Sequence, residues 1–111
     1  MEQQMGYGTV SVRQAADMMR SGRPPVVLDV REAWERNGGA LPGSLAIPAS
    51  RLEDMAPRLM PDRQRPVLVY CHTGAHSWQS AERLWEMGYA QVYDMMGGFL
   101  EWRMAWQRGW L

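Results

Sequence analysis

Apolar residues follow two different periods along this chain. Short apolar runs rich in β-branched residues, which are typical of strands buried on both faces, occupy residues 26–30, 67–70 and 92–94. Apolar residues three or four positions apart predict amphipathic helices over residues 12–19, 78–85 and 99–106. Because such strands alternate with such helices, the sequence predicts an α/β domain with a mainly parallel central sheet flanked by helices.

Capping and turn residues mark the ends of several of these elements. Ser11 and Gln14 have the spacing of a capping box at the start of the first helix. Ser77 is expected to cap the N-terminus of the helix that follows residues 67–70, and Gly88 is expected to end that helix. A serine at the N-terminus of a helix accepts hydrogen bonds from free backbone N–H groups, and a glycine after the C-terminus adopts the left-handed backbone that ends the helix.

The bulky apolar residues are expected to fill the core rather than to serve chemistry. Six tryptophans and ten methionines are many for 111 residues, and both types fill volume without a catalytic role. A helix that begins near Ser50 and Glu53 is expected to turn three apolar residues inward, namely Leu52, Met55 and Leu59. Trp110, next to the C-terminus, is expected to face solvent or an interface.

Length and charge exclude several classes of protein. A chain of 111 residues has the size of one domain, residues 1–111. No segment approaches the roughly 18 apolar residues of a membrane span, and the N-terminus lacks signal-peptide features, which predicts a cytoplasmic protein without a membrane partner. Twelve acidic and twelve basic residues leave no net charge to attract nucleic acid. All twelve basic residues are arginine, so lysine Schiff-base chemistry is excluded.

The lone cysteine, Cys71, is the main candidate for chemistry. It follows the apolar run of residues 67–70 and opens the stretch CHTGAHS, after which the helical pattern begins. Backbone N–H groups of such a loop, together with the positive end of the helix dipole, stabilise a thiolate, the nucleophilic form of cysteine. A free cysteine taken alone is more often a small buried hydrophobe. The strand, the loop and the helix start around Cys71 favour a nucleophile instead.

A second polar group follows the strand at residues 26–30. We interpret Asp29 and Arg31 as scaffold, because a paired acid and base at a strand end usually fixes neighbouring loops. No second carboxylate has a spacing that suggests a catalytic dyad. Gly97 and Gly98 are interpreted as a turn required by backbone geometry, because GGF lacks the third glycine and the lysine of phosphate-binding motifs.

Three segments, taken in their order and spacing, resemble the signatures of one enzyme family. They are LDVREAWERNGGALPGSLAIP from Leu28, VYCHTGAHS from Val69 and VYDMMGGFLEW from Val92. The family is the single-domain rhodaneses, or thiosulfate sulfurtransferases. The resemblance covers residues from about 9 to 106 and implies a rhodanese-like three-layer domain with a mainly parallel sheet between helices.

The resemblance also implies a covalent mechanism through Cys71. This residue would take the outer sulfur of thiosulfate or of a persulfide donor, become a persulfide and pass the sulfur to a thiol or to cyanide. Backbone N–H groups of one loop would hold the persulfide and the donor, the loop being His72, Thr73, Gly74, Ala75, His76 and Ser77. Asp29 and Arg31 would form a supporting shell, and no metal or other cofactor is implied.

A second interpretation keeps the chemistry but changes the partner. The chain would then be a sulfur-relay or persulfide-carrier module that acts with a sulfur-carrier protein and is weak on free thiosulfate. His76 stands where many relatives carry arginine, and Ala40 stands where many carry histidine. Because histidine is only partly cationic near neutral pH, we expect anionic donors to bind more weakly or with more pH dependence, unless His76 only fills the loop rim.

The length of the loop after Cys71 distinguishes a rhodanese-like protein from phosphatases built on a related fold. Those enzymes place an arginine six residues after the cysteine to hold phosphate, and here that position is Ser77. The shorter loop of the rhodanese family ends five residues after the cysteine, at His76. A smaller cradle suits a single sulfur atom better than phosphate, so phosphatase and arsenate reductase activities are disfavoured.

Overall fold

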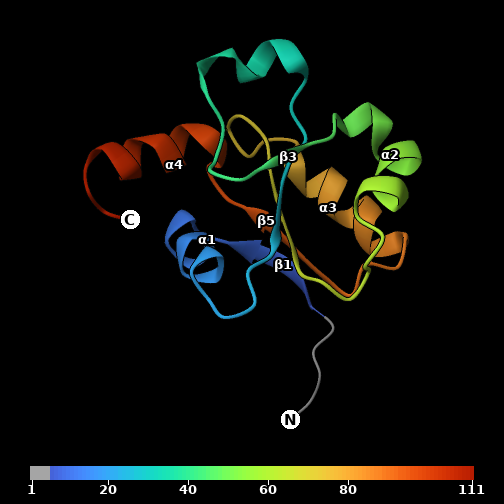
Figure 1. Ribbon diagram of the computed structural model, residues 1–111. Coiled ribbons are helices and arrows are strands. Elements are labelled where there is room, and N and C mark those ends of the chain that lie inside the picture. The colour runs from blue at the N-terminus through green and yellow to red at the C-terminus, as the bar shows by residue number, and fades with distance from the viewer. Residues whose placement is uncertain (1–5) are drawn as a thin grey trace.

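Five parallel strands form the central sheet, and helices cover both of its faces (Figure 1). The computed structural model describes residues 6–111. The strands are β1 (Gly6–Val10), β2 (Val26–Asp29), β3 (Leu45–Ala46), β4 (Val67–Tyr70) and β5 (Gln91–Met95). The α-helices are α1 (Val12–Met19), α2 (Leu52–Leu59), α3 (Ser77–Glu86) and α4 (Gly98–Gln107), and the 3₁₀ helices are η1 (Ala33–Gly38) and η2 (Ala49–Arg51). The predicted α/β class and parallel sheet are confirmed.

The strand order brings the carboxyl ends of β2 and β4 together. The order is β1-β5-β4-β2-β3, and the last residues of the central pair, Asp29 and Tyr70, lie in register. The chain leaves β2 toward β3 but leaves β4 toward β5, on the opposite side. Such a reversal opens a crevice at the carboxyl ends of the strands, where ligands bind in open α/β sheets. The residues that follow β2 and β4 therefore lie beside this crevice.

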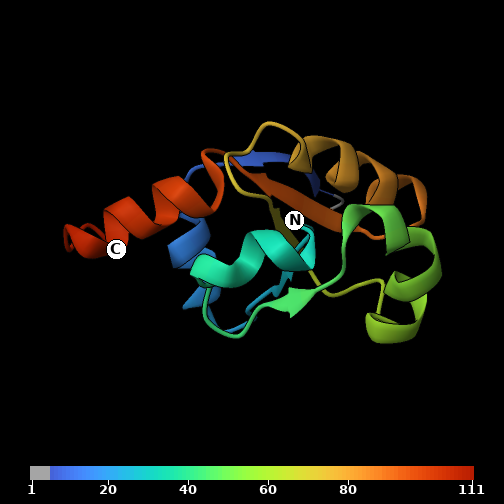
Figure 2. The same cartoon turned by 90° about the horizontal axis from the view of Figure 1, so that it is seen from above.

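Alternate side chains of the buried strands enter two separate hydrophobic clusters. On one face, Leu28, Val67 and Val69 pack with residues of α2 and α3. On the other face, Val27 and Leu68 pack with residues of α1 and α4. Figure 2 shows the two helix pairs on opposite sides of the sheet. Because both faces are covered, β2 up to Asp29 and the whole of β4 form continuous apolar runs instead of alternating with polar residues.

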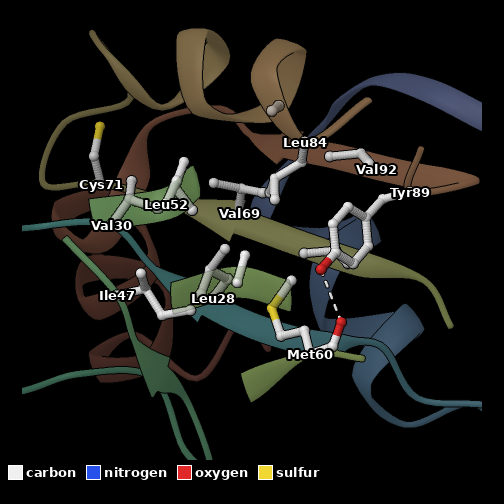
Figure 3. Close-up of a cluster of buried hydrophobic side chains, with 13 residues drawn as sticks. Leu28, Val30, Ile47, Leu52, Met60, Val69, Cys71, Leu84, Tyr89 and Val92 are labelled. Carbon is white, nitrogen blue, oxygen red and sulfur yellow. Dashed lines mark hydrogen bonds between the residues drawn. The ribbon is translucent and has the colours of Figure 1, made fainter. Parts of the chain in front are cut away.

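Cys71 lies at one end of the cluster that α2 and α3 cover (Figure 3). Its neighbours in the close-up are Val30 and Leu52, whereas Tyr89 and Met60 close the opposite end of the cluster. There the Tyr89 hydroxyl donates a hydrogen bond of 2.8 Å to the Met60 carbonyl. The cysteine is 8% exposed. Its side chain therefore packs on apolar groups while it stays at the border of the crevice.

Two helix boundaries predicted from the sequence are confirmed. Ser11 and Gln14 form both hydrogen bonds of a capping box at the start of α1. Gly88, with a φ of +96°, follows Met87, the C-cap residue of α3. The α-helices are eight to ten residues long. Within residues 6–111 no helix combines the length and apolar character that crossing a membrane requires.

Three local expectations differ from the structure. Strand β1 was not predicted, because its sequence GYGTV is rich in glycine and forms an edge strand that pairs only with β5. Ser50 lies inside η2 and does not cap α2, which begins at Leu52 without a side-chain cap. Leu59 was expected to face inward but is 47% exposed at the end of α2. The first two differences concern short segments with little periodicity, whereas Leu59 is exposed as the last residue of α2.

The sequence analysis expected the tryptophans to fill the core, but most of them lie outside it. Only Trp102 is buried, and Trp85 is half-buried and stacks on Tyr7 with ring centroids 5.6 Å apart. The other four are exposed, namely Trp34, Trp78, Trp106 and Trp110. The solvent exposure expected of Trp110 is confirmed. Smaller aliphatic residues from the strands already fill both clusters, so the indole rings remain on the outer sides of the helices.

We predict that Leu84→Ala lowers the free energy of unfolding by about 3 kcal/mol, because Leu84 is fully buried between α3 and the sheet. Leu59→Ala is the matched control, since it removes the same atoms from an exposed site on α2, and its cost is below about 1 kcal/mol. Urea denaturation followed by circular dichroism measures both values. Equal losses in the two variants would contradict the assigned packing of α3.

Candidate active site

Cys71 directly follows β4, and five loop residues separate it from α3. The loop curls back so that the N–H group of Gly74 donates a hydrogen bond of 3.2 Å to Cys71 Sγ. The first turn of α3 begins at the end of the same loop. A hydrogen-bond donor and the positive end of a helix both favour negative charge on sulfur. The predicted arrangement of strand, cysteine loop and helix is present in the structure.

The first turn of α4 holds the cysteine loop from the other side. The Phe99 N–H donates to the Cys71 carbonyl over 2.9 Å, and the Leu100 N–H donates to the His72 carbonyl over 3.0 Å. These two amides belong to the first residues of α4, which have no acceptor within their own helix. The helix and the loop therefore satisfy each other's backbone groups, and this fixes the main chain at Cys71.

Glycine is required where these two segments meet. A Cβ atom on Gly98, whose φ is +62°, would lie 2.7 Å from the Cys71 carbonyl oxygen. A Cβ atom on Gly74, whose φ is +88°, would lie 2.8 Å from the Gly97 nitrogen. Both distances are too short for a real contact, so the two backbones approach more closely than any side chain permits. The glycines of the GGF segment thus serve backbone geometry, as the sequence analysis interpreted them.

Ser77 has a different role from the predicted one. It is the first residue of α3 and is fully buried, and the residue at the N-cap position is His76. The Ser77 hydroxyl donates a hydrogen bond to the carboxylate of Asp94, a buried residue of β5. Burial raises the pKa of Asp94, and the hydrogen bond from Ser77 partly opposes this rise. Ser77 therefore ties α3 to the sheet and does not cap the helix.

Asp29 and Arg31 form a buried ion pair beneath the crevice. The Arg31 Nη2 atom lies 2.8 Å from Asp29 Oδ2, and both side chains are almost completely buried. The guanidinium also donates to the carbonyl oxygens of Glu35 and Gly39, so the pair anchors the segment that contains η1. Burial lowers the pKa of Arg31, but the hydrogen bond and the charge of Asp29 outweigh it and raise that pKa. These contacts agree with a scaffold role.

Aromatic groups complete the surroundings of this ion pair. The Tyr70 hydroxyl donates to Asp29 Oδ2 over 2.7 Å and accepts a hydrogen bond from the Leu41 N–H over 3.0 Å. The Arg31 guanidinium carbon lies 4.5 Å from the centre of the Phe99 ring. Burial raises the pKa of Tyr70, so its hydroxyl stays protonated and remains a donor at neutral pH. The charges of Asp29 and Arg31 are thus fully satisfied within the protein.

A cavity of about 540 Å³ opens beside Cys71. Its walls come from the loop after β2, from the cysteine loop, from η2 and α2, and from α3. The polar residues among its lining are Arg31, Glu32, Glu35, His72, Thr73, His76, Gln79, Ser80 and Arg83. The volume lies within the usual range of small-molecule sites.

The structure divides the predicted site residues into two groups. Cys71, His72, Thr73 and His76 line the cavity together with Arg31, whereas Gly74 reaches the site by its hydrogen bond to sulfur. Asp29 lies behind Arg31, Ala75 is exposed on the loop outside the lining, and Ser77 is buried toward the sheet. No three His, Cys, Asp or Glu side chains of the described part of the chain form a group that could hold a metal ion.

Sequence reasoning did not predict five polar residues of the lining, namely Glu32, Glu35, Gln79, Ser80 and Arg83. Gln79 and Arg83 follow His76 by three and seven positions, which is the spacing of one helix face. This regular spacing could have identified them once the helix was predicted to start at the cysteine loop. No comparable signal marked Glu35, because only the return of the η1 segment over the sheet brings it to the cavity.

Comparisons with known proteins agree with this geometry. The family model described as "Rhodanese-like domain" matches residues 11–105. The thiosulfate sulfurtransferase GlpE of Coxiella burnetii (strain RSA 331) is 30% identical over 99 residues, which are 89% of this chain and 90% of that protein. The human single-domain sulfurtransferase TSTD1 is 28% identical with a TM-score of 0.77, covering 89% of this chain and 97% of that one.

A further solved structure carries a different functional description. A protein of Rhodopseudomonas palustris described as of unknown function and a possible tyrosine phosphatase is 28% identical to this chain. Its TM-score is 0.77, and the match covers 89% of this chain and 81% of that one. The same fold thus occurs under two functional descriptions, and the residues around the cysteine must distinguish them.

We predict that Gly98→Ala destabilises the protein more than Gly43→Ala does. Both glycines have positive φ angles, so alanine carries a similar backbone strain of about 1–2 kcal/mol at each site. Only the Gly98 substitution also forces a Cβ atom against the cysteine loop, because Gly43 has open space around it. Thermal unfolding of the two variants gives the comparison. An equal loss of stability in the two variants would contradict the close contact between the cysteine loop and α4.

We also predict that Asp94→Asn gains stability relative to the wild type as the pH rises from the acidic range to neutrality. Burial raises the pKa of Asp94 in the folded state, so ionisation of this carboxyl group works against folding. Asparagine cannot ionise, yet its side-chain oxygen can still accept the hydrogen bond from Ser77. Denaturation curves over a pH series measure the difference. A difference that does not change with pH would refute the prediction.

Proposed function

The chain belongs to the family of rhodanese-like domains, and we propose that it is a sulfurtransferase that carries sulfane sulfur as a persulfide on Cys71. One observation carries this proposal: Cys71 Sγ accepts a hydrogen bond from the Gly74 N–H group at the edge of a cavity large enough for a small sulfur donor. The relatives named as sulfurtransferases support the reaction class. The alternative of a relay module shares the same cysteine chemistry and differs in the partner.

The reaction proceeds in two transfers at one sulfur atom. The Cys71 thiolate attacks the outer sulfur of thiosulfate, a new S–S bond forms at Sγ, and sulfite leaves with the electron pair of the broken bond. A thiolate or cyanide then attacks the outer sulfur of the persulfide and restores the Cys71 thiolate. A persulfide donor reacts in the same way and leaves as its thiolate. Charge and electrons balance in each transfer without a cofactor.

The cysteine loop supports this proposal through its backbone. In the proposed intermediate, N–H groups of residues 72–77 stabilise the negative charge of the outer sulfur, as the Gly74 N–H does for Sγ. The contact of the loop with α4 keeps these groups in place before the donor arrives. Thr73 and His76, which line the cavity, are the loop side chains we propose to contact the donor.

Phosphatase activity is disfavoured by the residue six positions after the cysteine. In this chain that residue is Ser77, whose hydroxyl is buried and bound to Asp94. It cannot supply the two-pronged arginine contact that holds a phosphate group. His76, the exposed residue before it, presents one imidazole ring. The proposal therefore assigns sulfur transfer to this chain, and places it in the cytoplasm, where reducing conditions keep a lone cysteine free.

We predict that incubation with thiosulfate raises the intact mass of the protein by about 32 Da, the mass of one sulfur atom, and that cyanide reverses the gain. Cys71→Ser keeps the size of the side chain but removes the thiolate, so this variant gains no mass. Electrospray mass spectrometry under non-reducing conditions measures both proteins. Since Cys71 is the only cysteine, no second thiol complicates the result.

Two outcomes distinguish the alternatives. If thiosulfate adds no sulfur but a persulfide donor does, the relay interpretation gains support, and a persulfidated carrier protein becomes the donor to test. If neither donor adds a sulfur that cyanide removes, the proposed function is wrong.

A further inference from the structure

The carboxylates at the cavity beside Cys71 are not neutralised. Glu32 and Glu35 both line the cavity, and neither forms an ion pair within residues 6–111. The Glu35 carboxylate accepts a hydrogen bond of 2.9 Å from the Glu32 N–H. That bond fixes the position of the group without removing its charge. Two negative charges therefore remain at the wall that faces an incoming donor.

The arginines of the cavity are already paired with other carboxylates. Arg31 is bound to Asp29 in the buried ion pair. Arg83 pairs with Glu53 of α2 and with Glu86, the latter at 3.2 Å. Each guanidinium therefore has a protein carboxylate as its partner. The other cavity side chains that can become cationic are the imidazoles of His72 and His76.

Glu32 and Glu35 are the charged lining residues that have no counter-ion within residues 6–111. The lining holds two arginines and two glutamates, and each arginine already has a carboxylate partner. The N–H groups of the loop act only over a short range, on the sulfur that is transferred. Carboxylates act over the whole cavity and so repel negative charge on the part of the donor that is not transferred.

We propose that this cavity selects sulfur donors whose non-transferred part carries no negative charge, so that a neutral or cationic persulfide reacts in preference to thiosulfate or an anionic persulfide. Glu32 and Glu35 are the residues that determine this specificity. The inference rests on the proposed function, because it concerns the donor of the Cys71 persulfide. The donor in this class is a low-molecular-weight persulfide that fits a cavity of about 540 Å³.

The transfer from such a donor is balanced. The Cys71 thiolate attacks the terminal sulfur of R–S–SH, the Sγ–S bond forms, and the S–S bond of the donor breaks. The electron pair of that bond leaves with R–S⁻, and the proton stays on the transferred sulfur or passes to water. A cationic R group places its positive charge beside the cavity carboxylates during this step, whereas a carboxylate in R meets repulsion.

A matched pair of donors tests the inference. The persulfides of cysteamine and 3-mercaptopropionate have the same chain length and differ in an ammonium or a carboxylate group. We predict that the rate constant for sulfur addition to Cys71, followed by intact mass and divided by the rate with a free small thiol, is about fivefold higher for the cysteamine persulfide. The apparent rate constant with thiosulfate should rise with sodium chloride concentration, because salt screens repulsion.

Variants that replace a cavity glutamate with glutamine test whether the difference between the two donors arises in the cavity. Glu35→Gln keeps the acceptor for the Glu32 N–H and should shrink the ratio between the two donors by about half or more, and Glu32→Gln should act in the same direction. Asp17→Asn is the matched control, because it makes the same change in net charge on the exposed surface of α1, across the sheet from the cavity. This control should leave the ratio unchanged.

Failure of the inference and failure of the proposed function give different results. Equal normalised rates for the two donors, or a thiosulfate rate that falls with salt, would overturn the inference while sulfur still adds to Cys71. A donor ratio that shifts equally in Asp17→Asn would also overturn it, because the effect would then follow net charge alone. No sulfur addition from any of the three donors would refute the proposed function and the inference with it.

Discussion

The contact on which this site depends is a packing of backbone against backbone. The loop that follows Cys71 lies against the turn at Gly97 and Gly98, so close that a single added methyl group at Gly98 would clash with carbonyl oxygens of the loop. The first amides of α4 then bind those carbonyl groups. A helix start with unsatisfied donors and a loop with unsatisfied acceptors complete each other. The direction of the Gly74 N–H toward sulfur follows from this fixed main chain.

The opposite wall of the crevice depends on a buried ion pair. Removing two charges from water costs several kcal/mol for each ion, and Asp29 and Arg31 offset this with a two-point contact and further hydrogen bonds. Among these, the bonds from Arg31 to the carbonyls of Glu35 and Gly39 matter most for the site, because they hold the η1 segment over the sheet. The carboxylates at the cavity wall are positioned through this segment. A scaffold pair therefore sets where the charges of the cavity lie.

Two groups around the cavity act on negative charge in opposite directions. The backbone next to Cys71 stabilises it on sulfur, and the carboxylates of Glu32 and Glu35 repel it elsewhere in the cavity. The Gly74 N–H group favours negative charge on the Cys71 sulfur within hydrogen-bond distance. The carboxylates of Glu32 and Glu35 act at longer range on any other charge that enters the cavity. Relatives of this chain are named both for sulfur transfer from thiosulfate and for sulfur transfer without a stated donor. Charge at the rim offers a physical basis on which members of one fold can differ in donor.

The sequence by itself determined the α/β class, the central buried strands, the capping of α1 and the placement of Cys71 between a strand and a helix. These features depend on apolar periodicity and on neighbours within a few residues, and both can be read along the chain. Only the tertiary structure decided that β1 pairs at the sheet edge, that Ser77 bonds to Asp94 instead of capping α3, and that most tryptophans stay outside the core. It also decided which charges meet at the cavity, since Glu35 and Arg83 lie far apart in the sequence and on different elements. Long-range pairing and the balance of buried charge depend on which segments come together in three dimensions, and local pattern carries no information about that choice.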